Sequence, residues 1–210
     1  MKQSGNARAI LRRLPKMYPD AACSLDYTTP FELLVATMLS AQSTDAMVNR
    51  VTPRVFERWP TPEALAKAKP SEVEEVIRST GYFRQKAKSI IGAAGAIVEE
   101  HGGEVPSTLD DLVALPGVGR KTANVVLGNA FGKNEGVVVD THVNRVSRLL
   151  GLTGKTDATK IERDLMEIVP RKSWTKFSHM LILHGRQVCV ARKPRCADCD
   201  LADLCPSSTV

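Results

Sequence analysis

The chain has 210 residues, enough for one large domain or two small ones with a substantial hydrophobic core. Apolar residues make up 43% of it and charged residues 25%, a balance that excludes a disordered or fibrous chain. There are 29 basic and 23 acidic residues, so the net charge is +6 and a polyanion is a candidate partner.

The N-terminal segment is basic but does not resemble a secretory signal peptide. Residues 1–20 contain five Lys or Arg residues and no apolar stretch. No apolar run approaches the length of a membrane span, so we expect a cytoplasmic protein without a membrane partner. The basic residues form two groups, either solvated or bound to a polyanion: Lys2, Arg8, Arg12, Arg13 and Lys16, and then Arg186, Arg192, Lys193 and Arg195.

Hydrophobic periodicity predicts an all-α fold, because apolar residues recur every three or four positions almost throughout. The predicted helices span 31–41, 44–58, 83–100, 108–114, 120–131, 141–150, 158–168 and 174–188. Ser71 and Glu74 have the spacing of a capping box, which predicts a helix start there. Only residues 137–139 favour an extended segment, which is too short to build a sheet.

The predicted helices divide into two lobes. Residues 22–132 form a continuous segment joined by short turns, and residues 133–210 carry a group of cysteines. We assign residues 1–21 to the second lobe, although periodicity alone allows them to pack on either one.

A glycine-rich turn joins two of the predicted helices. In the sequence Leu-Pro-Gly-Val-Gly-Arg-Lys-Thr, which starts at Leu115, the two glycines allow a tight turn and a close approach by a ligand. The next helix begins directly after Gly119, so its free N–H groups and positive dipole end suit a phosphate. A plain corner between two helices without a function is an equally good interpretation of this turn alone.

Five cysteines point to a metal site rather than to disulfides. Cys23 stands alone, and an odd number in a chain without a signal peptide argues against a disulfide framework. The other four, Cys189, Cys196, Cys199 and Cys205, are separated by six, two and five residues. Four clustered thiolates bind either zinc or an iron–sulfur cluster.

Four motifs together resemble the endonuclease III family of DNA glycosylases and AP lyases, in the helix–hairpin–helix superfamily. The motifs are the turn at 115–123, residues 39–45, residues 139–143 and the cysteine run, and they occur in the family's order along essentially the whole chain. The resemblance implies two helical lobes with a cleft between them and a helix–hairpin–helix at about 109–131. It also implies a [4Fe–4S] cluster held by the four C-terminal cysteines.

Two residues are expected to carry the chemistry. Lys121 lies at a predicted helix start, where the positive dipole end disfavours its protonated form. The resemblance implies that Lys121 attacks C1′ of the damaged nucleotide and that the resulting Schiff base permits β-elimination. Asp140 precedes a predicted helix and is a candidate N-cap; the resemblance adds a catalytic role beside the lysine.

The resemblance also implies a set of DNA contacts. Gln42 matches the family position that inserts into the duplex, and Tyr82 stands where a second inserted residue is commonly leucine. Ser40 and Asp45 are expected to line the base pocket. Backbone contacts are expected from the hairpin, at Pro116, Gly117, Val118, Gly119 and Arg120, and from the cysteine loop, at Arg192, Lys193 and Arg195.

The resemblance therefore implies a bifunctional glycosylase with AP lyase activity. Its expected partner is double-stranded DNA with oxidised or ring-saturated pyrimidines or abasic sites, bound by a monomer associated with the nucleoid. An adenine-type glycosylase of the same superfamily is an alternative, but that branch carries another residue in place of Lys121 and usually continues beyond a point such as Val210. A non-catalytic DNA-binding module is the other alternative.

Overall fold

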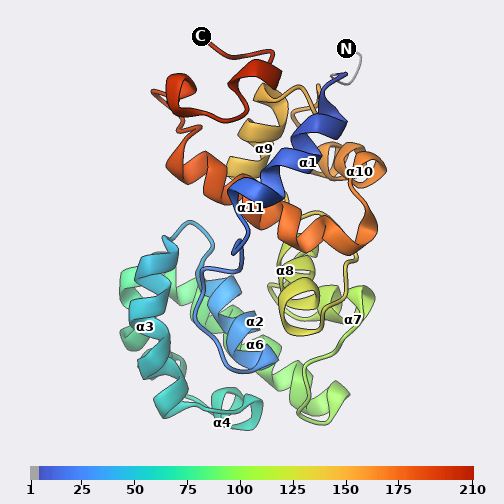
Figure 1. Cartoon of the computed structure of the whole chain (residues 1–210). Helices are drawn as coiled ribbons and strands as arrows, with labels where there is room; N and C mark the ends of the chain where they lie inside the picture. The colour runs from blue at the N-terminus through green and yellow to red at the C-terminus, as the bar shows by residue number, and fades with distance from the viewer. Residues whose placement is uncertain (1–4) are drawn as a thin grey trace. The chain divides into compact units, whose positions relative to one another are not determined.

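The computed structural model describes residues 5–210, and throughout that range the fold is all-helical, as predicted, with no strand (Figure 1). Lys2, which the sequence analysis placed in the basic N-terminal group, lies outside the described residues. The predicted helices are all present, with ends within one or two residues of the expected positions. In this part of the chain no helix is both long enough and apolar enough to span a membrane.

The chain divides into two compact units, which we describe separately. The unit Cys23–Lys133 contains α2 (Pro30–Leu39), α3 (Asp45–Arg58), α4 (Pro62–Ala66), α5 (Pro70–Ile77), η1 (Arg78–Thr80), α6 (Phe83–His101), α7 (Leu109–Ala114) and α8 (Arg120–Ala130). The other unit joins the N-terminal residues up to Ala22 with Asn134–Val210. It contains α1 (Ala7–Met17), α9 (Thr141–Leu149), α10 (Ala158–Ile168), η2 (Arg171–Ser173), α11 (Trp174–Gln187), η3 (Cys196–Asp198) and η4 (Ala202–Leu204).

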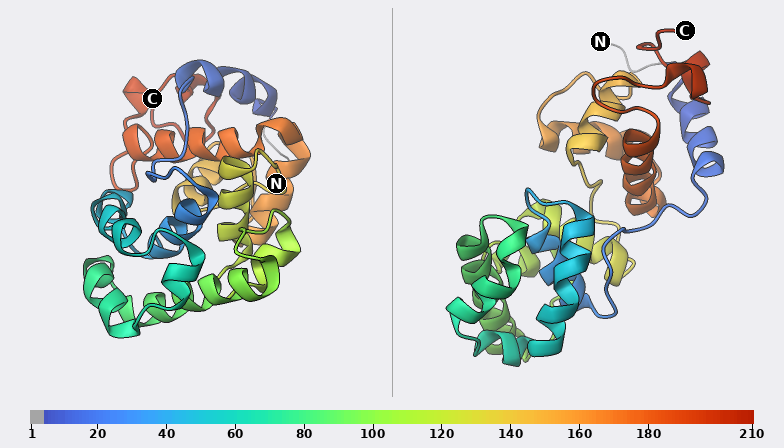
Figure 2. Two further views of the ribbon diagram at one scale, coloured as in Figure 1. Left: turned by 90° about the horizontal axis from the view of Figure 1, so that it is seen from below. Right: turned by 90° about the vertical axis from the view of Figure 1, so that its left-hand side faces the viewer.

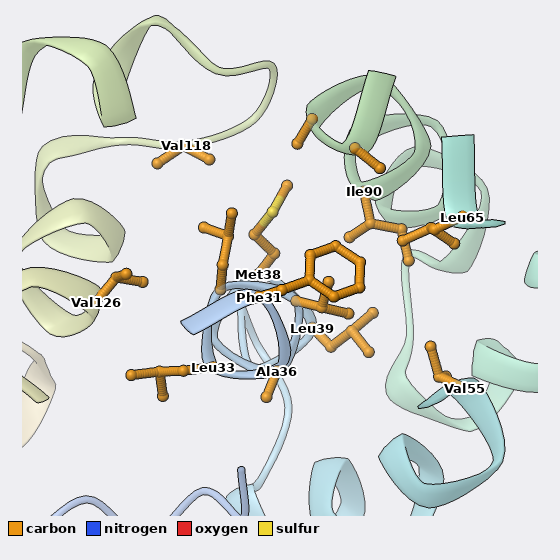
Figure 3. Packing of buried hydrophobic residues seen from close by; sticks show 14 of the residues in the cluster. Phe31, Leu33, Ala36, Met38, Leu39, Val55, Leu65, Ile90, Val118 and Val126 are labelled. Atoms are coloured by element: carbon orange, nitrogen blue, oxygen red, sulfur yellow. The ribbon is translucent and has the colours of Figure 1, made fainter. Parts of the chain in front are cut away.

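Helix α2 is the centre of the first unit. Eight of its ten residues are buried, and they lie on every side of the helix, so it needs neighbours all round. Figure 3 shows its side chains surrounded by Val55 of α3, Leu65 of α4, Ile90 of α6, Val126 of α8 and Val118 of the turn before α8. The helix begins cleanly because the Thr29 side chain accepts a hydrogen bond from the Glu32 N–H at 3.1 Å.

Helix α11 is the centre of the second unit. It packs against α1, η2 and α9, and its Phe177 and Leu181 are almost fully buried. Helix α1 crosses α11 in Figure 1, lies beside it in the views of Figure 2 and contributes Ile10 and Leu14 to the same core. The Arg13 guanidinium of α1 donates to the carboxylate of Asp203, which ties α1 to the C-terminal loop.

The predicted capping box at Ser71 and Glu74 is wrong. Helix α5 begins one residue earlier, at Pro70, and its N-cap residue Lys69 makes no side-chain capping bond. A proline fits the first helical position because its φ is already helical and its missing N–H would have had no partner inside the helix. The start of α5 is therefore set by Pro70 rather than by a serine cap.

Candidate functional site

The turn at residues 115–119 is anchored by apolar side chains and closed by glycine. Leu115 and Val118 are buried, and the Val118 N–H donates to the Leu115 carbonyl at 3.1 Å. Gly117 has a φ of +75°, and a Cβ at this position would lie 2.7 Å from Cβ of Ser89 and 3.3 Å from Cε of Met38. The turn therefore lies so close to α6 and α2 that only glycine fits at residue 117.

Helix α8 begins immediately after this turn. Its N-cap is Gly119, in an extended conformation and without a side-chain capping bond, and its first turn contains no acidic residue. Arg120 and Lys121 are both exposed. The helix start therefore presents N–H groups, the positive dipole end and two cationic side chains, an arrangement suited to a phosphate backbone.

Two exposed loops of the same unit have left-handed backbone at non-glycine residues. In residues 5–210 only Gln42 (φ 53°) and Tyr82 (φ 47°) combine a side chain with a positive φ. Gln42 follows the C-terminus of α2, and Tyr82, which is 68% exposed, precedes α6. A left-handed tyrosine is strained, and such conformations persist where the surrounding structure holds them. These are the two residues expected to enter the duplex.

The two expected base-pocket residues have local partners. Ser40 Oγ donates to the Thr37 carbonyl at 2.8 Å, at the end of α2. Asp45 is the first residue of α3, and its carboxylate accepts a hydrogen bond from Ser24 Oγ at 2.5 Å. Both side chains are half-buried, and these bonds fix them to the ends of helices.

Asp140 is the N-cap of α9. Its Oδ1 accepts a hydrogen bond from the Val143 N–H at 2.7 Å, and the residue is half-buried. Asp140 therefore caps α9, as its position in the sequence predicts. Lys121 belongs to the first unit, whereas Asp140 and the four C-terminal cysteines belong to the second.

The four C-terminal cysteines line a single cavity, together with the half-buried Leu149 and the buried His184. Burial raises the pKa of the Cys189 and Cys199 thiols, and hydrogen bonds from Thr209 lower the pKa of Cys196. Within residues 5–210 no three His, Cys, Asp or Glu side chains are arranged to hold a single metal ion. The four thiols line one largely apolar pocket, and four thiolates can hold zinc or an iron–sulfur cluster.

The loop between the cysteines exposes its basic residues. Arg192, Lys193 and Arg195 are all exposed, and the Arg195 guanidinium also donates to the Gln187 carbonyl at the end of α11. Arg145 of α9 supports the same loop, because its Nη2 donates to the Gly185 carbonyl at 2.8 Å and to the Cys189 carbonyl at 2.9 Å.

Sequence reasoning missed two buried polar residues near these sites. His184 Nδ1 pairs with the Tyr18 hydroxyl at 2.9 Å, and its Nε2 lies 3.8 Å from Sγ of Cys199. Lys86 of α6 is buried, although lysines are usually exposed. Its place on the same helix face as Ala87 and Ile90 was the signal that could have revealed it.

Known DNA repair proteins match this chain over most of its length. Residues 35–171 match the model of the HhH-GPD superfamily base excision DNA repair proteins. Endonuclease III of Synechocystis is 59% identical over 96% of this chain and 92% of its own, and that of Escherichia coli K12 is 42% identical over 93% and 92%. A solved non-covalent complex of endonuclease III with DNA matches with a TM-score of 0.93 at 44% identity, over 99% of this chain and 97% of the solved one.

Gly117→Ala should destabilise the first unit, since the added Cβ meets Ser89 and the left-handed φ becomes strained. We expect a loss of about 1–3 kcal/mol in the free energy of unfolding, measured by chemical denaturation. Gly95→Ala is the matched control, because Gly95 lies within α6 with open space around it and alanine is the better helix former. The control should gain about 0.5–1 kcal/mol. An equal effect of the two substitutions would contradict the packing described for the turn.

Proposed function

Because the chain belongs to the HhH-GPD superfamily of base excision DNA repair proteins, and within it to the endonuclease III family, we propose that it excises damaged pyrimidines from duplex DNA and cleaves the resulting abasic site. It is a DNA glycosylase with AP lyase activity. The proposed substrates are oxidised or ring-saturated pyrimidines, and the proposed working state is a monomer bound to double-stranded DNA.

The observation that carries the proposal is the exposed amine of Lys121 at the uncapped start of α8. In the proposed mechanism the Nζ lone pair attacks C1′ of the damaged nucleotide, and the damaged base leaves with its bonding electrons and takes up a proton. The attached amine then loses a proton and the C1′–O4′ bond breaks, which opens the sugar ring, places a proton on O4′ and gives the Schiff base. The Schiff base acidifies the proton at C2′. Loss of that proton expels the 3′ phosphate by β-elimination, and water then releases the sugar fragment from Lys121.

Asp140 supplies the carboxylate of the mechanism. One of its oxygens already accepts the Val143 N–H, which fixes the side chain at the start of α9. A carboxylate held in this way stabilises positive charge that develops on the sugar and moves protons between the steps. The cap and the catalytic role are therefore compatible in one residue.

DNA contacts are proposed at two kinds of surface. The duplex backbone binds Pro116, Gly117, Val118, Gly119 and Arg120 of the hairpin, and Arg192, Lys193 and Arg195 of the cysteine loop. A base must leave the stack before C1′ can be attacked, and Gln42 and Tyr82 fill the space that it vacates. Ser40 and Asp45 contact the extruded base.

We propose that Cys189, Cys196, Cys199 and Cys205 hold a [4Fe–4S] cluster. Their side chains line one cavity with apolar neighbours, which fits a buried group with four thiolate ligands. When bound, the cluster supplies a covalent cross-link that fixes the loop carrying Arg192 and Lys193. Cys23 belongs to the other unit, at the edge of its core, and takes no part.

Lys121→Gln should abolish covalent trapping. We expect the unaltered protein to form a borohydride-reduced adduct with a duplex that contains one thymine glycol, because reduction captures the Schiff base. The glutamine side chain of the variant lacks a nucleophilic amine, so the band should disappear from a denaturing gel. Lys160→Gln, at an exposed lysine of α10, is the control and should trap normally. Trapping by the Lys121 variant at the normal rate would overturn the assignment.

Asp140→Asn should separate the capping role from the chemistry. Asparagine caps helices as well as aspartate does, so the free energy of unfolding should change by less than about 0.5 kcal/mol. Excision of thymine glycol should nevertheless fall about 10²–10⁴-fold, since the carboxylate is lost. Asp140→Ala should lose activity and also about 0.5–2 kcal/mol of stability. Full activity in the asparagine variant would show that Asp140 is only a cap.

Removal of one cluster cysteine should remove the metal. We expect the purified protein to contain about four iron atoms per chain and to absorb visible light. Cys199→Ser should lose most of the iron and the colour, whereas Cys23→Ser should retain both. Iron analysis and absorption spectroscopy measure the two properties. Zinc in place of iron, or equal losses from both variants, would contradict the proposed ligand set.

A further inference from the structure

Lys86 is a buried cation that the proposed chemistry does not use. The residue is 7% exposed, and burial lowers the pKa of its ammonium group. Its Nζ donates one hydrogen bond to the Leu39 carbonyl and another to the Thr80 carbonyl, each at 2.7 Å. Burying a lysine is costly, so a lysine kept inside the unit and bonded to main-chain carbonyls calls for an explanation beyond packing.

The two carbonyls lie at the helix ends that lead into the two loops with left-handed residues. Leu39 is the last residue of α2, and Gln42 follows it by three positions. Thr80 is the last residue of η1, and Tyr82 follows it by two. One ammonium group therefore bonds to the chain just before each loop, at the ends of α2 and η1 (α2 and α6 are labelled in Figure 1).

The two hydrogen bonds from the Lys86 ammonium group can hold the main chain at Leu39 and Thr80 in a fixed position. Leu39 ends α2, where carbonyls lack helical partners and the dipole is negative, so a cation there is favoured. A charge-assisted hydrogen bond in a buried site is stronger than a neutral one. The Lys86 N–H also donates to the Tyr82 carbonyl at 3.0 Å, which is the ordinary main-chain bond at the start of α6, so the restraint specific to Lys86 comes from its ammonium group.

We propose that Lys86 is a positioning residue, whose buried ammonium joins the Leu39 and Thr80 carbonyls and thereby sets the separation and the left-handed conformations of the loops that carry Gln42 and Tyr82. The inference rests on the proposed function, in which these two side chains enter the duplex together. Lys86 touches no substrate and acts through the two loops.

A substrate that needs no inserted side chains separates this role from a general structural one. A single-stranded oligonucleotide with an abasic site presents C1′ to Lys121 without an opened duplex. A duplex with thymine glycol requires Gln42 and Tyr82 to fill the vacated space. Loss of the loop restraint should therefore impair the second substrate and spare the first.

Lys86→Met removes the two hydrogen bonds and keeps an unbranched side chain. We expect kcat/KM on the thymine glycol duplex to fall about tenfold to hundredfold, the scale of a small misplacement. Borohydride trapping on the single-stranded abasic oligonucleotide should stay within about twofold of normal. Lys86→Arg retains donors for both carbonyls and should recover most of the duplex activity. Lys67→Met, at an exposed lysine that follows α4, should change neither substrate.

If Lys86→Met folds poorly, Lys86→Gln takes its place, because its side chain is polar but uncharged and too short to bond both carbonyls. Lys86→Gln should lower the duplex activity of the otherwise unaltered chain. In a chain that carries Gln42→Ala and Tyr82→Ala, the loops have nothing left to position, so adding Lys86→Gln should cost no further duplex activity. An additional loss there, or equal losses on the two substrates for Lys86→Met, would show that Lys86 is merely structural. Normal duplex activity of Lys86→Met would also overturn the inference.

The same assays distinguish failure of this inference from failure of the proposed function. If the unaltered protein neither excises thymine glycol nor forms an adduct with the abasic oligonucleotide, the proposed function itself fails. If it does both and Lys86→Met matches it on the duplex, only the positioning role fails.

Discussion

The burial of α2 on every side is the constraint on which the first unit depends. An apolar helix without a solvent face must be surrounded, and α3, α6 and α8 pack around it. The hairpin lies against it as well, since Gly117 lies beside the end of the Met38 side chain, in a space that Ser89 of α6 closes to any Cβ. Because α2 ends at Leu39, the position of its C-terminus also sets where the loop with Gln42 begins. One buried helix thus supports the hairpin before Lys121 and one of the two loops proposed to enter DNA.

Much of the fold could be predicted from the sequence because the signals are local. Apolar periodicity located the long helices, and the glycines around Val118 located the turn before α8. Local signals fail where two of them compete. At the start of α5, Ser71 has the spacing of a cap, but Pro70 takes the first helical position and moves the helix start.

Contacts between distant residues could not be predicted from the pattern. The bond from Lys86 to Leu39 joins residues 47 apart, and the bond between Tyr18 and His184 joins residues 166 apart. Periodicity likewise left the packing of α1 open, whereas the structure buries Ile10 in the core that contains α11. A buried polar group needs a hydrogen-bond partner, and that partner can come from a distant part of the chain. Only the folded structure therefore identifies it.

In the proposed mechanism the Lys121 amine forms the bond to the sugar, and the position of that bond in the protein can be determined. The borohydride-reduced adduct formed with thymine glycol DNA would be digested with protease and nuclease, and the modified peptide sequenced by mass spectrometry. If Lys121 is the nucleophile, a single reduced sugar adduct should be found on Nζ of Lys121. An adduct on the N-terminal amine or on another lysine would contradict the mechanism.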